Sequence, residues 1–327
     1  RSVTEAIQVI FHTPIPKELA EILPNRMMKN SMKREKNVLE SRVRVCFEYA
    51  DEDFLYVTPV DEVSDDYWKI RYNQLGVNDE FTEGIKEYWR HAQLNLLDVK
   101  RNEDGTYTPT FIVLEPDYLV DISALAECYR EYGSHPANYI MSRLVPIDNA
   151  RPLLLGNIAN LFLDEWIYAS EEEPEYLDCM KKVFKRYPVE LAACEELLDK
   201  EKETAFFKDC QMHFEHIRQT VKDTFLEPGY NLDKSDAVLE PSYICEALGV
   251  QGRLDYMQRD MSSFIEMKSG KADEYAMKGK LEPKENNRVQ MLLYMAVLEY
   301  SMGIDRRKQH PYLLYTRYPL LYPARAS

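Results

Sequence analysis

Two short stretches near the end of the chain decide the fold: Gly249–Asp255 reads GVQGRLD, and Phe264–Lys271 reads FIEMKSGK. Residues two apart on a β-strand share a face, so Glu266 and Lys268 point to one side and the apolar residues next to them to the other. Two charged groups among apolar neighbours are costly to bury without a partner or a task. The second stretch therefore predicts a strand with a functional polar pair on one face.

The first stretch supplies a second acid, Asp255. If the two strands pair as a hairpin, the midpoint between Asp255 and Glu266 falls between Asp260 and Met261, where a turn is expected. Directly opposed side chains lie about 4.5–5.5 Å apart at Cβ. Paired carboxylates of this kind favour Mg²⁺ or Mn²⁺, which polarises a phosphate oxygen and activates water. Lys268 would orient or help to deprotonate that water and balance charge that develops on the phosphate.

A predicted helix, Asn286–Tyr300, follows these strands and carries Gln290 and Tyr294. A spacing of four residues puts both on one helical face, where Gln290 would bond to water or phosphate and Tyr294 would brace it. Taken alone, this pair fits an ordinary helix with one polar residue near its start. The acid–lysine strand alone likewise fits a surface hairpin with an incidental ion pair. The glycines, the apolar strand context and the helix together favour the functional interpretation.

The ordered set G-x-x-G-R-x-D, E-x-K-S-G-K and Q-x-x-x-Y resembles the RecB-like branch of the PD-(D/E)xK nuclease superfamily, above all the nuclease domains of flap-processing replication nuclease-helicases. The resemblance covers about Glu240–Tyr300 and extends more weakly to Leu114–Ser123 and Leu155–Asn160. It implies a restriction-endonuclease-like α/β core that hydrolyses DNA with a divalent metal. The implied substrate is single-stranded DNA at ends or flaps in replication or repair, and the implied partner is a helicase domain or subunit.

Two positions depart from this family. Its upstream helix usually carries a metal-binding histidine, four residues after a glycine, where this chain has Asn160 after Gly156. Asn160 is a weaker, neutral oxygen ligand, so it ligates the metal, bonds to a metal-bound water, or marks reduced activity. Many relatives also hold an iron–sulfur cluster on four cysteines, three of them after the core. No cysteine follows Cys245 here, so no iron–sulfur cluster is expected, and Cys128 is interpreted as a buried structural residue.

Composition restricts the setting of the protein. The net charge of -15 argues at first sight against DNA, but the charge is uneven. Residues 229–327 hold 14 Lys and Arg against 13 Asp and Glu, whereas residues 1–228 hold 27 against 43. The six scattered cysteines suit reduced thiols, and no apolar run of membrane-spanning length occurs. We therefore expect a cytoplasmic protein without a membrane partner.

The predicted fold class is α/β: a nuclease core with a helical flank, preceded by a small barrel-like module. Residues 1–115 are expected to contain a charged helix at 17–40, a helix at Phe81–Leu97, an Asp104-Gly105 hairpin turn, and strands at Val43–Glu48, Phe54–Val57, Trp68–Tyr72 and Tyr107–Leu114. Residues 116–327 form the nuclease domain, with a helical insertion around 170–228. Its expected helices are Asp121–Tyr129, His135–Leu144, Gly156–Ala169, Glu190–Phe225 and Asn286–Tyr300, and its strands are Ala237–Ala247, Gln251–Met257, Ser263–Lys268 and Tyr312–Tyr315.

Candidate DNA contacts surround the predicted site: Arg253, Lys271, Tyr275, Lys280 and Arg288. Lysines near the strand would line a groove, and Tyr275 would stack on a base. Solvated loop lysines are an equally good account of the same residues. A further pair, His213 and His216, lies three apart on a predicted helix, which fits a polar helix face better than a zinc site.

Three functions remain open on the sequence. The first is a nuclease that acts on single-stranded ends or flaps. The second is a nuclease fold with weakened catalysis that binds DNA for a helicase, for which Asn160 is the best argument. The third is a restriction-type endonuclease on duplex DNA, which shares the same core residues.

Overall fold

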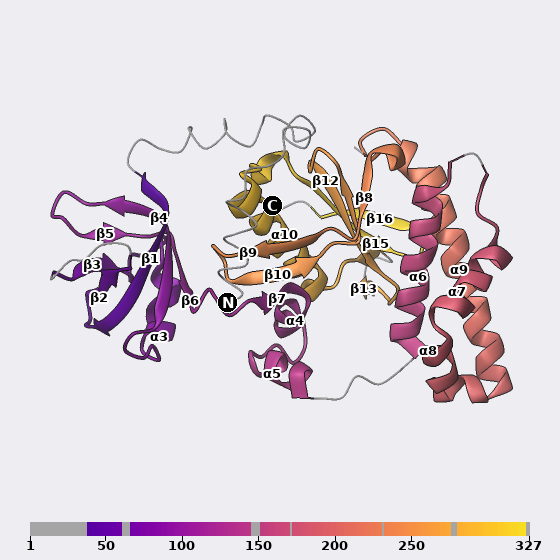
Figure 1. Cartoon of the computed structure of the whole chain (residues 1–327), viewed down its shortest axis with the longest axis horizontal. Helices are drawn as coiled ribbons and strands as arrows, with labels where there is room; N and C mark the ends of the chain where they lie inside the picture. The colour runs from indigo at the N-terminus through magenta and orange to yellow at the C-terminus, as the bar shows by residue number, and fades with distance from the viewer. Residues whose placement is uncertain are drawn as a thin grey trace. The chain divides into compact units, whose positions relative to one another are not determined.

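The computed structural model describes residues 38–60, 66–144, 151–170, 172–230, 232–275 and 280–324, with side chains from residue 41 on and without those of 273–275 and 280. These residues belong to one compact unit, Val38–Ser327. They form a mixed α/β structure that includes a closed, barrel-like sheet (Figure 1). Most of the helix predicted at 17–40 lies outside the described residues, and its last three positions open a strand instead.

The barrel-like sheet is built from six strands: β1 (Val38–Ala50), β2 (Phe54–Pro59), β3 (Trp68–Arg71), β4 (Gln93–Arg101), β5 (Tyr107–Thr108) and β6 (Phe111–Leu114). The order β1-β2-β3-β5-β4 closes through a β1–β4 pairing, and β6 adds to β4. Closure removes the open edges of the ring. Alternate residues of β1 and β2, among them Val45, Phe47, Leu55 and Val57, fill its interior. The strands predicted at Val43–Glu48 and Phe54–Val57 are confirmed.

The helix predicted at Phe81–Leu97 is wrong. Only η1 (Asp79–Phe81) and α3 (Thr82–Ile85) are helical there, and β4 follows. Leu94 and Leu96 are fully buried and pair with Val45 and Val43 of β1. Pairing with β1 overrides local helix propensity, because this strand is what closes the ring. The predicted Asp104-Gly105 turn does join two antiparallel strands, β4 and β5, with Gly105 at φ +82°.

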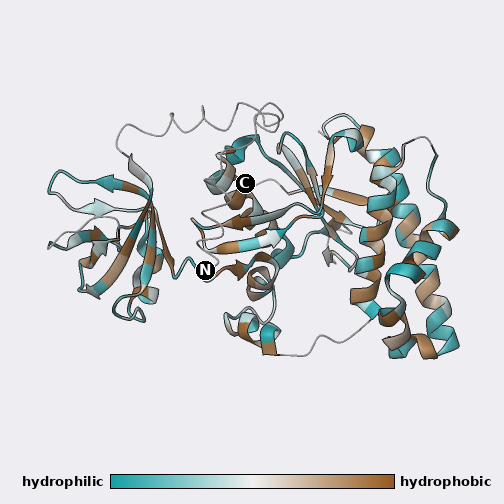
Figure 2. Cartoon of the chain, viewed as in Figure 1, coloured by the Kyte–Doolittle hydropathy of each residue, from teal (hydrophilic) through white to brown (hydrophobic). Residues whose placement is uncertain are grey.

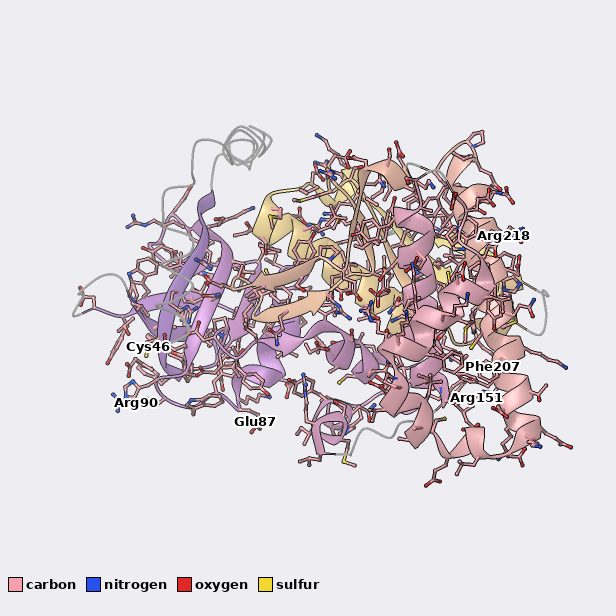
Figure 3. All side chains as sticks on the ribbon, turned by 45° about the vertical axis from the view of Figure 1, so that its right-hand side comes forward. Cys46, Glu87, Arg90, Arg151, Phe207 and Arg218 are labelled. Carbon is pink, nitrogen blue, oxygen red and sulfur yellow. The ribbon has the colours of Figure 1, made fainter. Side chains whose placement is uncertain are left out.

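Helices dominate the middle of the chain: α4 (Ile122–Ala126), η2 (Glu127–Tyr129), α5 (Ala137–Leu144), α6 (Arg151–Tyr168), α7 (Tyr176–Arg186), α8 (Pro188–Ala193), η3 (Glu195–Leu198), α9 (Lys200–Lys222), η4 (Thr224–Leu226) and η5 (Lys234–Asp236). Asp121, the first residue of the helix predicted at Asp121–Tyr129, caps α4, since its side chain accepts a hydrogen bond from the Ala124 amide. The single helix predicted at Glu190–Phe225 is broken, because the Asp199 carboxylate accepts from two amides and starts α9. Arg151 of α6, labelled in Figure 3, pairs with Asp209 of α9 at 2.6 Å.

The second half of the chain forms small sheets from β7 (Val120–Asp121), β8 (Ala237–Leu239), β9 (Ser242–Cys245), β10 (Val250–Arg253), β11 (Tyr256–Gln258), β12 (Ser263–Lys268), β13 (Asp273–Tyr275), β14 (Lys280–Glu282), β15 (His310–Tyr315) and β16 (Leu320–Pro323). Their orders are β7-β10-β9, β16-β15-β12-β11-β8 and β13-β14. The predicted strands Ala237–Ala247 and Gln251–Met257 are each divided in two. At the first break Glu240 has φ +50° and precedes Pro241, so the ladder cannot continue.

Two helical layers cover opposite faces of the five-stranded sheet (Figure 1). Ile265 and Met267 of β12 join a core with α6 and α9. On the other face, Phe264 packs with Met291 and Tyr294 of α10 (Glu285–Met302). Figure 2 shows that the strands and α6 carry much of the apolar surface that these layers bury. Strand β12 thus lies in the middle of the sheet, with α10 above the face that carries Glu266.

Candidate metal centre

A tight hairpin joins β11 and β12. Tyr256 pairs with Ile265 and Met257 with Phe264, and the Met261 amide closes the turn on the Gln258 carbonyl at 2.8 Å. The same register, continued by one residue, sets Asp255 opposite Glu266. Asp255 lies just before β11, and its Oδ2 accepts from the Met267 amide at 2.6 Å. The first acid is therefore held against the backbone of the strand that carries the second.

Glu266, Lys268 and Gln290 form one hydrogen-bonded cluster. Lys268 Nζ lies 3.0 Å from Glu266 Oε1 and 2.8 Å from Gln290 Oε1, and Gln290 Nε2 donates to Glu266 Oε1 at 2.7 Å. Gln290 also donates to Ser123 Oγ at 3.1 Å. The side chain of Glu266 is 8% exposed and that of Lys268 is 25% exposed. The cluster is enclosed by protein, yet solvent reaches its amine.

The charges in this cluster oppose one another. Burial raises the pKa of Asp255 well above its usual value, and the neighbouring Glu266 raises it further. Burial by itself lowers the pKa of Lys268, but the contact with Glu266 and the charge of Asp255 leave that pKa above its usual value. Lys268 is therefore a firmly protonated cation. The single positive charge of Lys268 offsets only one of the two carboxylic acids, so Asp255 and Glu266 together lack one positive charge.

Glu266 Oε2 and Asn160 Oδ1 belong to a group of six buried side-chain atoms that have no hydrogen-bond partner among the residues that the structure describes; the others are Trp166 Nε1, His213 Nε2, Ser263 Oγ and Gln309 Oε1. Asn160 lies on α6, one turn after Gly156, where a Cβ would be 3.3 Å from Ser269 Oγ. This close approach brings α6 to the end of β12. Unsatisfied buried oxygens are rare and costly, so they need an explanation. The carboxylates of Asp255 and Glu266 are hard oxygen donors of the kind that Mg²⁺ and Mn²⁺ prefer.

Tyr294 braces the site from α10. Its hydroxyl donates to the Arg253 carbonyl at 2.7 Å, just before Asp255 in the chain. Burial, followed by the charge of Glu266, raises the pKa of Tyr294, so its hydroxyl stays protonated. Gly252 lies directly against the ring, because a Cβ there would be 2.9 Å from the hydroxyl oxygen. Tyr294 thus ties α10 to the strand that leads into the acid.

The structure describes the side chains of only three of the five residues that the sequence predicts to contact DNA. Lys271 and Arg288 are exposed. Arg253 is also exposed, and its guanidinium lies 3.3 Å from Glu240. Tyr275 and Lys280 face each other in the β13–β14 ladder, but their side chains lie outside the described residues.

Histidines of α9 hold the end of β12, a role that the sequence did not indicate. His213 Nδ1 lies 2.9 Å from Thr316 Oγ1, and His216 Nδ1 lies 3.0 Å from the Thr316 carbonyl. The Thr316 amide in turn donates to the Lys268 carbonyl at 3.0 Å. Burial lowers the pKa of His213, which favours its neutral form. The interpretation of this pair as a polar helix face is wrong for His213, which is 1% exposed.

A further acid on α6, Asp164, was also missed. It lies one helical turn beyond Asn160 on α6, and that spacing is the signal that would have found it. Burial, then repulsion from Glu240, raises the pKa of Asp164 to about 6, while Arg186 and Arg253 oppose the rise. A carboxyl group that burial destabilises in this way is typical of a functional position.

Asp164→Asn is expected to stabilise the fold above a pH of about 6. Because the pKa of Asp164 is raised, the folded state loses stability as the pH rises from 3.8 through about 6. Asparagine stays neutral, so the substitution raises the free energy of unfolding by about 1 kcal/mol, after allowance for solvent screening of a partly exposed group. This gain disappears in acid. Urea unfolding across this pH range measures it. Asp178→Asn is the control, because Lys181 lowers the pKa of Asp178. A gain for Asp164→Asn that did not vary with pH would contradict the assignment.

A scan against models of protein families found no match, and a search of curated proteins found no relative of this chain. No helix among the described residues is both long and apolar enough to cross a membrane.

Proposed function

We propose that this chain is a metal-dependent deoxyribonuclease of the RecB-like PD-(D/E)xK type. Its substrate is single-stranded DNA at ends or flaps formed in replication or repair, and its partner is a helicase domain or subunit. The observation that carries the proposal is the convergence of Asp255, Glu266 and Lys268, with one oxygen of Glu266 and one of Asn160 buried and unpartnered.

Asp255, Glu266 and Asn160 are the residues that would hold the ion. When bound, Mg²⁺ or Mn²⁺ supplies Lewis-acid chemistry at a phosphate oxygen and at water. In the reaction, a water oxygen attacks phosphorus and the bond to the 3′ oxygen breaks, which leaves a 5′-phosphate and a 3′-hydroxyl. Lys268, whose ammonium group lies 3.0 Å from Glu266 Oε1, would orient or help to deprotonate the attacking water and balance charge that develops on the phosphate. Gln290 forms hydrogen bonds with both Lys268 and Glu266 and so holds their side chains in place.

Exposed cations support a DNA substrate. Arg253 is the last residue of β10, two positions before Asp255, and Lys271 follows the catalytic strand by three positions. These two positions suit contacts with phosphates beside the scissile bond, where Lys and Arg supply most of the affinity. Such contacts weaken as salt increases. Arg288 lies on the first turn of α10, two residues before Gln290, so it projects from about the opposite side of the helix.

Cleavage of end-labelled oligonucleotides tests the proposal. We expect the wild-type chain to cut single-stranded and flap substrates with Mg²⁺ or Mn²⁺ and to stop on chelation, with less cutting of blunt duplex DNA. Asp255→Ala should be inactive. Asp260→Ala, which removes an exposed carboxylate from the turn of the same hairpin, should stay active. Tight DNA binding without cleavage by the wild type would replace the proposal with a DNA-binding module, and preferred cutting of duplex DNA would favour a restriction-type enzyme.

A further inference from the structure

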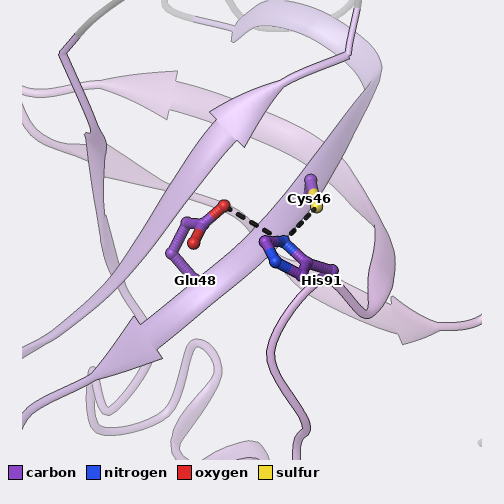
Figure 4. A group of neighbouring side chains, drawn as sticks. All are labelled: Cys46, Glu48 and His91. Atoms are coloured by element: carbon purple, nitrogen blue, oxygen red, sulfur yellow. Dashed lines mark hydrogen bonds and ion pairs between the residues drawn. The ribbon is translucent and has the colours of Figure 1, made fainter.

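A second group of metal-ligating side chains lies on the barrel, in the segment around β1. Cys46 and Glu48 are two apart on β1, so both point out of the barrel, while Val45 and Phe47 fill its interior. His91 comes from the turn that leads into β4 and lies between them (Figure 4). Their ligand atoms all lie within 4.8 Å of one another.

The backbone fixes His91 in this position. The His91 amide donates to the Phe47 carbonyl at 2.6 Å, and the Phe47 amide donates to the Ala92 carbonyl at 2.9 Å. These bonds bind the turn to β1 between Cys46 and Glu48. His91 has φ +69°, a left-handed conformation that is unfavourable for a residue with a side chain. Such strain gathers at functional positions, where the surrounding contacts hold the residue in place.

The distances are close to those of a tetrahedral ion. His91 Nδ1 lies 3.9 Å from Cys46 Sγ and 3.4 Å from Glu48 Oε1. With metal–ligand bonds of about 2.0–2.3 Å, two ligand atoms of a tetrahedral zinc lie roughly 3.3–3.7 Å apart. Shifts of a few tenths of an ångström would bring these two pairs to that spacing, and the ligand atoms of Cys46 and Glu48 lie within 4.8 Å of each other. The second oxygen of Glu48 accepts from Arg90 Nε at 2.9 Å, which holds the carboxylate with its other oxygen toward His91.

The exposure of Glu48 and of His91 is also compatible with a bound ion. The side chain of Glu48 is only 11% exposed and that of His91 is 64% exposed, so the carboxylate forms the floor and the imidazole the rim. Arg90 is a competing cation, but it contacts the oxygen that faces away from His91. Sulfur, nitrogen and oxygen donors together favour Zn²⁺ over Mg²⁺ or Ca²⁺.

We propose that Cys46, Glu48 and His91 bind one Zn²⁺ ion on the barrel, with its fourth position open to solvent. The ion links β1 to the turn before β4. This site is separate from the candidate nuclease centre in its residues and in the class of metal that it takes. It therefore stands whether or not the proposed nuclease activity does.

Titration of the metal-free, full-length chain with Co²⁺ tests the site, because a thiolate bound to Co²⁺ gives a near-ultraviolet charge-transfer band. We expect that band to saturate at one ion per chain and to vanish when Zn²⁺ is added. Asp255→Asn should keep the band, since the nuclease centre has no thiol ligand. Cys46→Ser should lose it.

His91→Gly is a second test variant that should keep the fold, because glycine adopts the left-handed backbone of this position without strain while the imidazole is removed. Its affinity for Zn²⁺ should fall by about 100-fold, whereas His135→Ala, which removes an exposed imidazole elsewhere, should bind as the wild type does. No charge-transfer band with excess Co²⁺, or a band that persists in Cys46→Ser, would overturn the proposal.

Discussion

Glu266→Gln is expected to lower metal-dependent DNA cleavage by about 1,000-fold or more. Glutamine keeps the shape of the side chain and can still accept from Lys268 and Gln290 through its carbonyl oxygen. The oxygen that has no partner, Oε2, becomes an NH₂ group, which cannot ligate a cation. The variant should therefore lose both cleavage and high-affinity Mn²⁺ binding. Single-turnover cleavage and Mn²⁺ titration measure the two effects.

The fold should survive this change, because the substitution removes a buried charge without altering volume. Glu285→Gln is the matched control, since Glu285 is exposed on the first turn of α10, the helix that carries Gln290. It should cleave at the wild-type rate. Undiminished cleavage by Glu266→Gln, with the fold intact by circular dichroism, would remove Glu266 from the chemistry and contradict the proposed metal site.

Local rules were enough to predict the centre of the site. Alternation along the strand placed Glu266 and Lys268 on one face, and the count of residues between Asp255 and Glu266 set the hairpin turn. Helical spacing put Gln290 and Tyr294 on one side of α10. These relations involve residues close in sequence, where the strand and helix periods alone fix direction.

The parts that failed depend on partners distant in sequence. Leu94 and Leu96 sit in a stretch with helical character, and only the pairing with β1, about 50 residues earlier, makes it a strand. The link from Lys268 through Thr316 to His213 spans two further elements, so no local pattern contains it. The burial of Asp164 likewise depends on the packing of α6 against the sheet. In all three cases contacts between elements distant in sequence, rather than local secondary-structure propensity, determine the structure.

Gly252→Ala is expected to destabilise the fold by about 1–3 kcal/mol, the range for overpacking a filled core. A Cβ at this position would lie 2.9 Å from the Tyr294 hydroxyl oxygen, 3.0 Å from Tyr294 Cε1 and 3.0 Å from Ile122 Cδ1. Tyr294 and Ile122 are fully buried, so neither has room to move aside. Chemical denaturation measures the loss. Gly270→Ala, two residues after Lys268, is the matched control, because a Cβ there meets no atom within 4 Å.

A double-mutant cycle then isolates the contact between Gly252 and Tyr294. Tyr294→Phe by itself should cost about 1–3 kcal/mol, because the Arg253 carbonyl loses its donor. In the Gly252→Ala background the same change also removes the atom nearest the new methyl group, so the double variant should be less destabilised than the sum of the two single variants. Relief should be partial, since Cε1 and Ile122 Cδ1 stay at 3.0 Å. Strict additivity would mean that the glycine of G-x-x-G-R-x-D and the tyrosine of Q-x-x-x-Y do not act as one packed unit.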